Sequence, residues 1–91
     1  MFKKIHLIIS GKVQGVFYRA NAKGKAEELN LKGWVKNTPD NKVEIMAEGE
    51  EDKLREMIEW CYNVSSAAVV SDIKTEWMEA GKKFDKFEIV V

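Results

Sequence analysis

The sequence predicts an α+β fold in which two helices pack on one face of an antiparallel sheet. Several segments alternate apolar with polar residues, as strands do, and two others repeat apolar residues every three or four positions, as helices do. The chain has 91 residues, of which 45% are hydrophobic and 33% charged. That length suits one domain over residues 1–91 with a single core.

The first part of the chain predicts a strand followed by a helix. Residues 5–10 alternate in hydrophobicity, which indicates a strand with one buried face. That face is expected to hold Ile5, Leu7 and Ile9. His6 falls on the opposite face with no acid nearby in sequence, so we expect a surface or packed histidine rather than a catalytic base. Helical spacing follows at Ala22, Ala26 and Leu29. The pair Asn30 and Leu31 is typical of a left-handed helix cap.

Two further strands and the second helix occupy the middle of the chain. Residues 33–37 and 43–48 predict strands joined by a turn at 38–41, in which Pro39 fixes φ and Asn41 can take the left-handed position. The following segment predicts a helix with acidic residues in its first turn, where they favour the helix dipole. Its apolar stripe is Leu54, Met57, Ile58 and Cys61.

The remainder predicts a loop at 63–68, a strand at 69–77, a turn at 80–83 and a short final strand at 87–91. The order is therefore β-α-β-β-α-β with one more short strand at the end. This order is typical of the split βαβ, or ferredoxin-like, sandwich, in which two helices cover one face of an antiparallel sheet.

Charge and cysteine content narrow the classes of function. Fifteen basic residues balance fifteen acidic ones, but residues 1–26 hold six basic residues and no acid, so we expect a positive region around the loop after the first strand. A single cysteine and a single histidine exclude a structural zinc site, and Cys61 is expected to be a small buried apolar residue. The chain shows no membrane span and no signal-peptide pattern, which predicts a cytoplasmic protein, and its balanced charge favours a monomer.

The stretch GKVQGVFYR at residues 11–19 has the pattern of a phosphate-binding loop between a strand and a helix. Gly15 can take positive φ, which lets successive main-chain N–H groups turn toward one point. The helix start at Val16, Phe17 and Tyr18 offers no capping side chain, so its N–H groups are left for a ligand. Arg19 adds a planar fork that matches two phosphate oxygens.

Asn37 is the second candidate site residue. It stands near a strand end beside a tight turn, and its carboxamide can both accept and donate hydrogen bonds. From the residues alone, two interpretations stay open: Asn37 opens the turn, or it holds a water molecule in place.

Two motifs together, SGKVQGVFYR at residues 10–19 and GWVKN at 33–37, resemble the two signatures of the acylphosphatase family. Val43, the pair Glu48 and Gly49, and the closing FDKFEI at 84–89 extend the resemblance through the whole chain. Two motifs at a fitting separation are much more specific than one glycine-rich loop.

The resemblance implies hydrolysis of small acyl phosphates to a carboxylate and inorganic phosphate by direct attack of water, without metal or organic cofactor. It assigns phosphoryl binding to Arg19 and orientation of the water to Asn37. The loop positions that would hold the phosphate through main-chain N–H groups are Gln14, Gly15, Val16, Phe17 and Tyr18.

The chain departs from the family pattern at three places. Phe17 is bulky where many relatives have a small residue, and its ring either narrows the mouth of the site or packs on the surface. Asn41 replaces the usual glycine of the hairpin turn, and residues 63–68 lack the usual glycine and prolines. None of these changes touches Arg19 or Asn37.

Two other classes of function are alternatives. One is a phosphate-binding module without turnover, like the acylphosphatase-like domain within larger maturation proteins. The other is nucleic-acid binding on the open sheet face, which the absence of aromatic residues from segments 5–10 and 43–48 and the zero net charge argue against. We therefore expect no nucleic-acid and no membrane partner.

Overall fold

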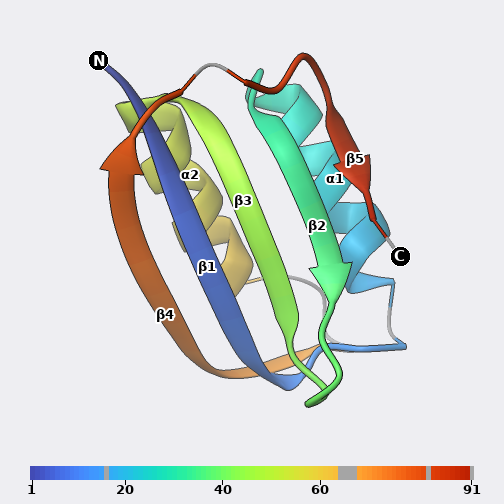
Figure 1. Ribbon diagram of the computed structural model, residues 1–91. Coiled ribbons are helices and arrows are strands. Elements are labelled where there is room, and N and C mark those ends of the chain that lie inside the picture. The colour runs from blue at the N-terminus through green and yellow to red at the C-terminus, as the bar shows by residue number, and fades with distance from the viewer. Residues whose placement is uncertain (16, 64–67, 82, 91) are drawn as a thin grey trace.

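The structure is a computed structural model that describes residues 1–15, 17–63, 68–81 and 83–90 (Figure 1). Its elements are β1 (Phe2–Lys12), α1 (Tyr18–Glu28), β2 (Lys32–Asn37), β3 (Val43–Glu50), α2 (Glu51–Tyr62), β4 (Val69–Glu79) and β5 (Phe87–Ile89). This order is the predicted one. Strands β1 and β4 extend beyond the apolar alternation, because backbone pairing between them continues from Lys3 to Lys12.

The five strands form one sheet in the order β4-β1-β3-β2-β5. Strand β1 pairs antiparallel with β3 and β4, and β2 pairs antiparallel with β3, which confirms the predicted hairpin and the antiparallel character of these four strands. The short strand β5 joins the free edge of β2 in parallel, with Gly33 opposite Phe87. Both helices lie behind the sheet in the view of Figure 1, so one face is covered and the other is open.

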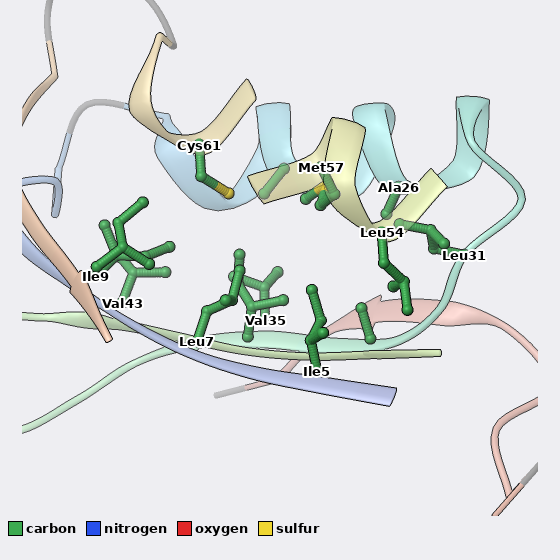
Figure 2. Close-up of a cluster of buried hydrophobic side chains, with 14 of the residues drawn as sticks. Ile5, Leu7, Ile9, Ala26, Leu31, Val35, Val43, Leu54, Met57 and Cys61 are labelled. Carbon is green, nitrogen blue, oxygen red and sulfur yellow. The ribbon is translucent and has the colours of Figure 1, made fainter. Parts of the chain in front are cut away.

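The core lies between the helices and the covered face of the sheet (Figure 2). Ile5, Leu7 and Ile9 of β1 are fully buried there, which confirms the predicted inward face. They pack with residues of the other strands and of both helices, among them Val35, Val43, Ala26, Leu54, Met57 and Cys61. Among the described residues, no helix is long and apolar enough to cross a membrane.

His6 lies on the open face and has an acidic partner that sequence reasoning did not find. Its Nε2 atom lies 2.6 Å from Oε2 of Glu44. The two residues are 38 positions apart in the chain, but antiparallel pairing of β1 with β3 places Ile8 opposite Glu44 and so brings His6 beside it. Both side chains are about one-fifth exposed, and the pair is part of the sheet surface.

Glu48 is a buried carboxylate in β3. Its Oε2 accepts a hydrogen bond from the main-chain N–H of Gly81 at 2.7 Å. Gly81 belongs to the connection between β4 and β5, so this bond ties that connection to the sheet. Hydrogen bonds to a carboxylate offset part of the free-energy cost of burying its charge, whereas an unpaired carboxylate would bear the full cost.

Gly33 is required where β2 begins. Its φ of 144° is in the region that side-chain-bearing residues avoid, and a Cβ atom there would lie 1.9 Å from the Met46 carbonyl oxygen. We expect Gly33→Ala to lower the free energy of unfolding by about 3 kcal/mol through overpacking and backbone strain. Urea denaturation measures the loss.

Gly24, in the exposed middle of α1, is the matched control for Gly33. A Cβ atom there meets nothing within 4 Å. Gly24→Ala should therefore raise the free energy of unfolding by about 0.5–1 kcal/mol, the usual difference in helix propensity. Equal effects of the two substitutions would contradict the close approach of β2 to β3.

Cys61 is fully buried in the core, and burial raises the pKa of its thiol to about 12. Because the thiolate is the reactive form, we expect negligible alkylation of the folded protein by iodoacetamide at pH 8 and rapid alkylation in denaturant. Mass spectrometry of the two samples measures the difference. Rapid labelling under native conditions would show that Cys61 is accessible.

Candidate functional site

The chain reverses between β1 and α1 through two residues with positive φ. Val13 is buried directly after β1, and Gly15 then has a φ of 75°. Phe17 has φ 61° and ψ 20°, the left-handed conformation, and α1 begins at Tyr18. Val16, one of the predicted loop residues, lies outside the described residues. The predicted use of Gly15 for positive φ is confirmed, and Phe17 adds a second such position.

The start of α1 has no side-chain cap. The N–H groups of the first turn therefore have no acceptor within the helix, and the positive end of the helix dipole lies at the same place. This matches the prediction from the missing Ser, Thr, Asp or Asn. Such a helix start favours the binding of an anion.

Tyr18 fixes the start of α1 against α2. Its hydroxyl donates a hydrogen bond to the Cys61 carbonyl at 2.9 Å, and its ring centroid lies 5.9 Å from that of Trp60. Burial raises the pKa of the Tyr18 phenol above its ordinary value, so the side chain stays neutral. Tyr18 therefore contributes packing and one fixed hydrogen bond.

Arg19 occupies the second position of α1 and is half-buried. Arg19 is one of the residues that line a depression of about 270 Å³. In the part of the chain that the structure describes, Arg19 forms no ion pair with a carboxylate. Its guanidinium group is thus available for an anionic ligand at the helix start.

Gln14 joins this loop to the hairpin between β2 and β3. Its Nε2 donates to the carbonyl oxygens of Thr38 at 3.0 Å and Lys42 at 2.8 Å. Both side-chain hydrogens of the amide are used, so the side chain has one orientation. The loop that precedes Arg19 is therefore held against the residue that follows Asn37.

Asn37 is the last residue of β2. Its Oδ1 is buried, and among the described residues it is the one buried side-chain polar atom without a hydrogen-bond partner. A buried acceptor of this kind is costly unless something donates to it. The hydrogen-bonding capacity of this oxygen is thus unused within the described part of the chain.

The hairpin turn after Asn37 is fixed by its own hydrogen bonds. Thr38 N–H donates to the Lys42 carbonyl at 2.9 Å, and Lys42 N–H donates to the Thr38 hydroxyl at 3.0 Å. A hydrogen bond from Thr38 also lowers the pKa of Asp40. Asn41 has φ 66°, the left-handed position expected for it. The carbonyl oxygens to which Gln14 donates therefore lie in a turn that has its own hydrogen bonds.

The depression brings together only some of the predicted site residues. It is lined by Val13, Gly15, Phe17, Tyr18, Arg19, Ala20 and Ile89. Gln14 and Asn37 are not part of that lining, although the bond from Gln14 to Thr38 places them at the adjoining strand end. Ile89 was not predicted, because only the parallel pairing of β5 with β2 brings it here.

The positive region is smaller than the charge distribution along the sequence suggested. Lys23 and Lys25 form ion pairs with Glu27 and Glu28 of their own helix. Lys3 and Lys4 lie at the start of the 11-residue strand β1, about 30 Å from its other end at 3.3 Å per residue. Of the basic residues among the first 26, Lys12 and Arg19 are the two that lie near the loop after β1. In the described ranges, no group of three or more potential metal ligands comes together.

Comparisons with known proteins agree with this fold and these motifs. The acylphosphatase family model matches residues 5–89. A protein named acylphosphatase from Marinobacter nauticus is 49% identical over 90% of this chain and 89% of its own. The crystal structure of acylphosphatase from Bacillus subtilis superposes with a TM-score of 0.94, at 36% identity and full coverage of both chains.

A crystal structure of full-length HypF, in a phosphate- and nucleotide-bound form, also contains this fold. The match has a TM-score of 0.88 at 29% identity and covers all of this chain but 12% of that one. The family model and the relatives that match over most of their length establish the family. This chain belongs to the acylphosphatase family.

Proposed function

We propose that this protein hydrolyses the carboxyl–phosphate bond of acyl phosphates, with Arg19 and the start of α1 binding the phosphoryl group and Asn37 orienting the attacking water. The observation that carries the proposal is the position of Arg19, which pairs with no described carboxylate, at a helix start without a side-chain cap. Gln14 joins the loop before this helix to Thr38, the residue that follows Asn37. The family's name supports the reaction class.

The phosphoryl group would be held by fixed donors. The guanidinium group of Arg19 can donate hydrogen bonds to two phosphoryl oxygens. Main-chain N–H groups of the loop and of the first turn can donate to the remaining phosphoryl oxygen. The positive φ of Gly15 and Phe17 turns this backbone, and the two hydrogen bonds of Gln14 keep it in place. Donors that are already fixed need no reorganisation as charge develops.

Asn37 would position the nucleophile. The carboxamide of Asn37 would accept a hydrogen bond from a water molecule, which leaves a lone pair of that water free to approach phosphorus. Attack forms the new bond between phosphorus and the water oxygen. The bond between phosphorus and the bridging oxygen breaks, and the carboxylate departs with the bonding pair, while both protons of the water remain on the product as dihydrogen phosphate.

No covalent nucleophile is needed in this mechanism. The leaving carboxylate is stable without protonation, so the enzyme mainly positions water and stabilises the charge on the phosphoryl oxygens in a loose transition state. The buried thiol of Cys61, whose pKa burial raises to about 12, takes no part.

We also propose that the enzyme acts as a monomer in the cytoplasm, for which its zero net charge and small size are the support.

A recognition module without turnover is the alternative, since full-length HypF contains the same fold as a small part of a longer chain. The two functions separate in one assay. Hydrolysis of benzoyl phosphate, followed by ultraviolet absorbance in the presence of a chelator, should be fast for the enzyme. Competitive binding of inorganic phosphate without hydrolysis would favour the module.

Substitutions of Arg19 and Asn37 should separate binding from catalysis. We expect Arg19→Ala to abolish phosphate binding and turnover, because the positive charge and the planar set of guanidinium donors are lost together. Asn37→Ala should lower kcat by at least about 100-fold, the usual cost of losing one preorganised polar group, and leave phosphate inhibition largely intact. Benzoyl phosphate kinetics with phosphate as the competitor measure both effects.

Asn21→Ala and Arg55→Ala are matched controls for these substitutions. Asn21 is exposed two positions after Arg19 on α1, and Arg55 lies on α2 paired with Glu51. Both variants should retain normal kinetics. Near-normal turnover by Asn37→Ala would contradict its role with the water.

Gln14 should act on this site through the loop. Gln14→Met keeps a side chain of similar length but removes both donors, and should lower the free energy of unfolding by about 1–2 kcal/mol. Gln14→Glu should cost more, because its carboxylate would face two carbonyl oxygens. Urea denaturation compares them, and a free energy of unfolding within about 0.5 kcal/mol of wild type for both, a tenth of a stability of about 5 kcal/mol, would refute this attachment.

A further inference from the structure

Phe17 combines two unfavourable features in one residue. Its backbone is left-handed at φ 61°, which glycine adopts at little cost and an aromatic residue rarely does. Its ring is also 81% exposed to solvent, so it gains little from packing in the protein itself. A strained residue with an exposed apolar ring points to a function for the ring.

Phe17 is one of the residues that line the depression to which Arg19 also belongs. Ile89 of β5, itself 41% exposed, contributes to the same lining, as do Val13 and Ala20. Arg19 is the single charged residue among the described residues that form it. The depression therefore has one cationic group and apolar walls that reach solvent.

The proposed mechanism decides which part of the substrate meets these walls. In phosphoryl transfer the attacking and leaving oxygens are roughly in line on opposite sides of phosphorus. Asn37, which would hold the attacking water, does not line the depression, whereas Phe17 and Ile89 do. The acyl group, opposite the water, would then lie over the depression.

We propose that Phe17 and Ile89 form an apolar acyl-binding surface that makes the enzyme prefer acyl phosphates with extended alkyl or aromatic groups over acetyl phosphate. This inference rests on the proposed function, because it needs the phosphoryl group at Arg19. Charged acyl groups would be disfavoured, since the walls offer them no partner.

The expected size of the preference for longer acyl chains follows from the apolar surface area of the chain that binding removes from water. Complete burial of one methylene group changes an equilibrium about 4-fold at 25 °C. Contact with an open surface covers roughly half of that area, which corresponds to about 2-fold for each methylene group. Hexanoyl phosphate has four methylene groups more than acetyl phosphate, and the product of these factors is about 16, so its kcat/KM should be on the order of 10-fold higher.

The test compares kcat/KM for acetyl, butanoyl and hexanoyl phosphates in the wild type and three variants. Straight-chain carboxylates leave about equally well, so the ratio between substrates reports binding of the chain. Phe17→Gly should lower the ratio of hexanoyl to acetyl phosphate from about 10 to about 3, and Ile89→Ala should give an intermediate ratio. Phe2→Gly removes the same ring at the opposite end of β1 and should leave the ratio unchanged.

Binding of non-hydrolysable analogues gives a second readout. In 2-oxopropylphosphonate and 2-oxoheptylphosphonate a CH₂ group replaces the bridging oxygen of acetyl and hexanoyl phosphate. Calorimetry should show the longer analogue binding about 10-fold more tightly to the wild type and about 3-fold more tightly to Phe17→Gly.

The outcomes distinguish the two proposals. Turnover of all three acyl phosphates with a ratio below 2, or with a ratio that Phe17→Gly leaves unchanged, overturns the acyl-binding surface and leaves the proposed function standing. No turnover together with the expected ratio of analogue affinities refutes the hydrolytic function and supports the surface. No turnover and equal analogue affinities refute both.

Discussion

The site depends on the backbone reversal between the end of β1 at Lys12 and the start of α1 at Tyr18. A strand and a helix can be joined this tightly because Gly15 and Phe17 both take positive φ. The same reversal leaves the first turn of α1 without a cap, and it brings Arg19 to the edge of the depression. The proposed anion binding would thus be a consequence of how this connection is made.

This reversal is held from two sides. Tyr18 bonds to the carbonyl of Cys61 in α2, and Gln14 bonds to the two carbonyls of the hairpin at Thr38 and Lys42. The hairpin follows Asn37, so the element that would hold water and the loop that would hold phosphate share one attachment. A site formed by fixed main-chain groups and two side chains suits a reaction that requires positioning more than acid–base chemistry.

Local features were predictable from sequence, and long-range ones were not. The inward face of β1 followed from alternation, and the left-handed Asn30 and Asn41 followed from the tolerance of asparagine for that conformation. The acceptors of Gln14 lie 24 and 28 positions away, and Ile89 reaches the depression only through parallel pairing of β5. No local pattern carries such information. The left-handed Phe17 was unpredictable because aromatic residues seldom adopt it.

The proposed mechanism requires that phosphate binds at the loop and the start of α1, and amide chemical shifts during titration with inorganic phosphate test this claim. We expect saturable shifts that are largest for the main-chain N–H groups of Gly15, Phe17, Tyr18 and Arg19, and no such shifts in Arg19→Ala. Shifts that instead gather on the open sheet face around His6 and Lys36, or that persist in Arg19→Ala, would contradict the claim.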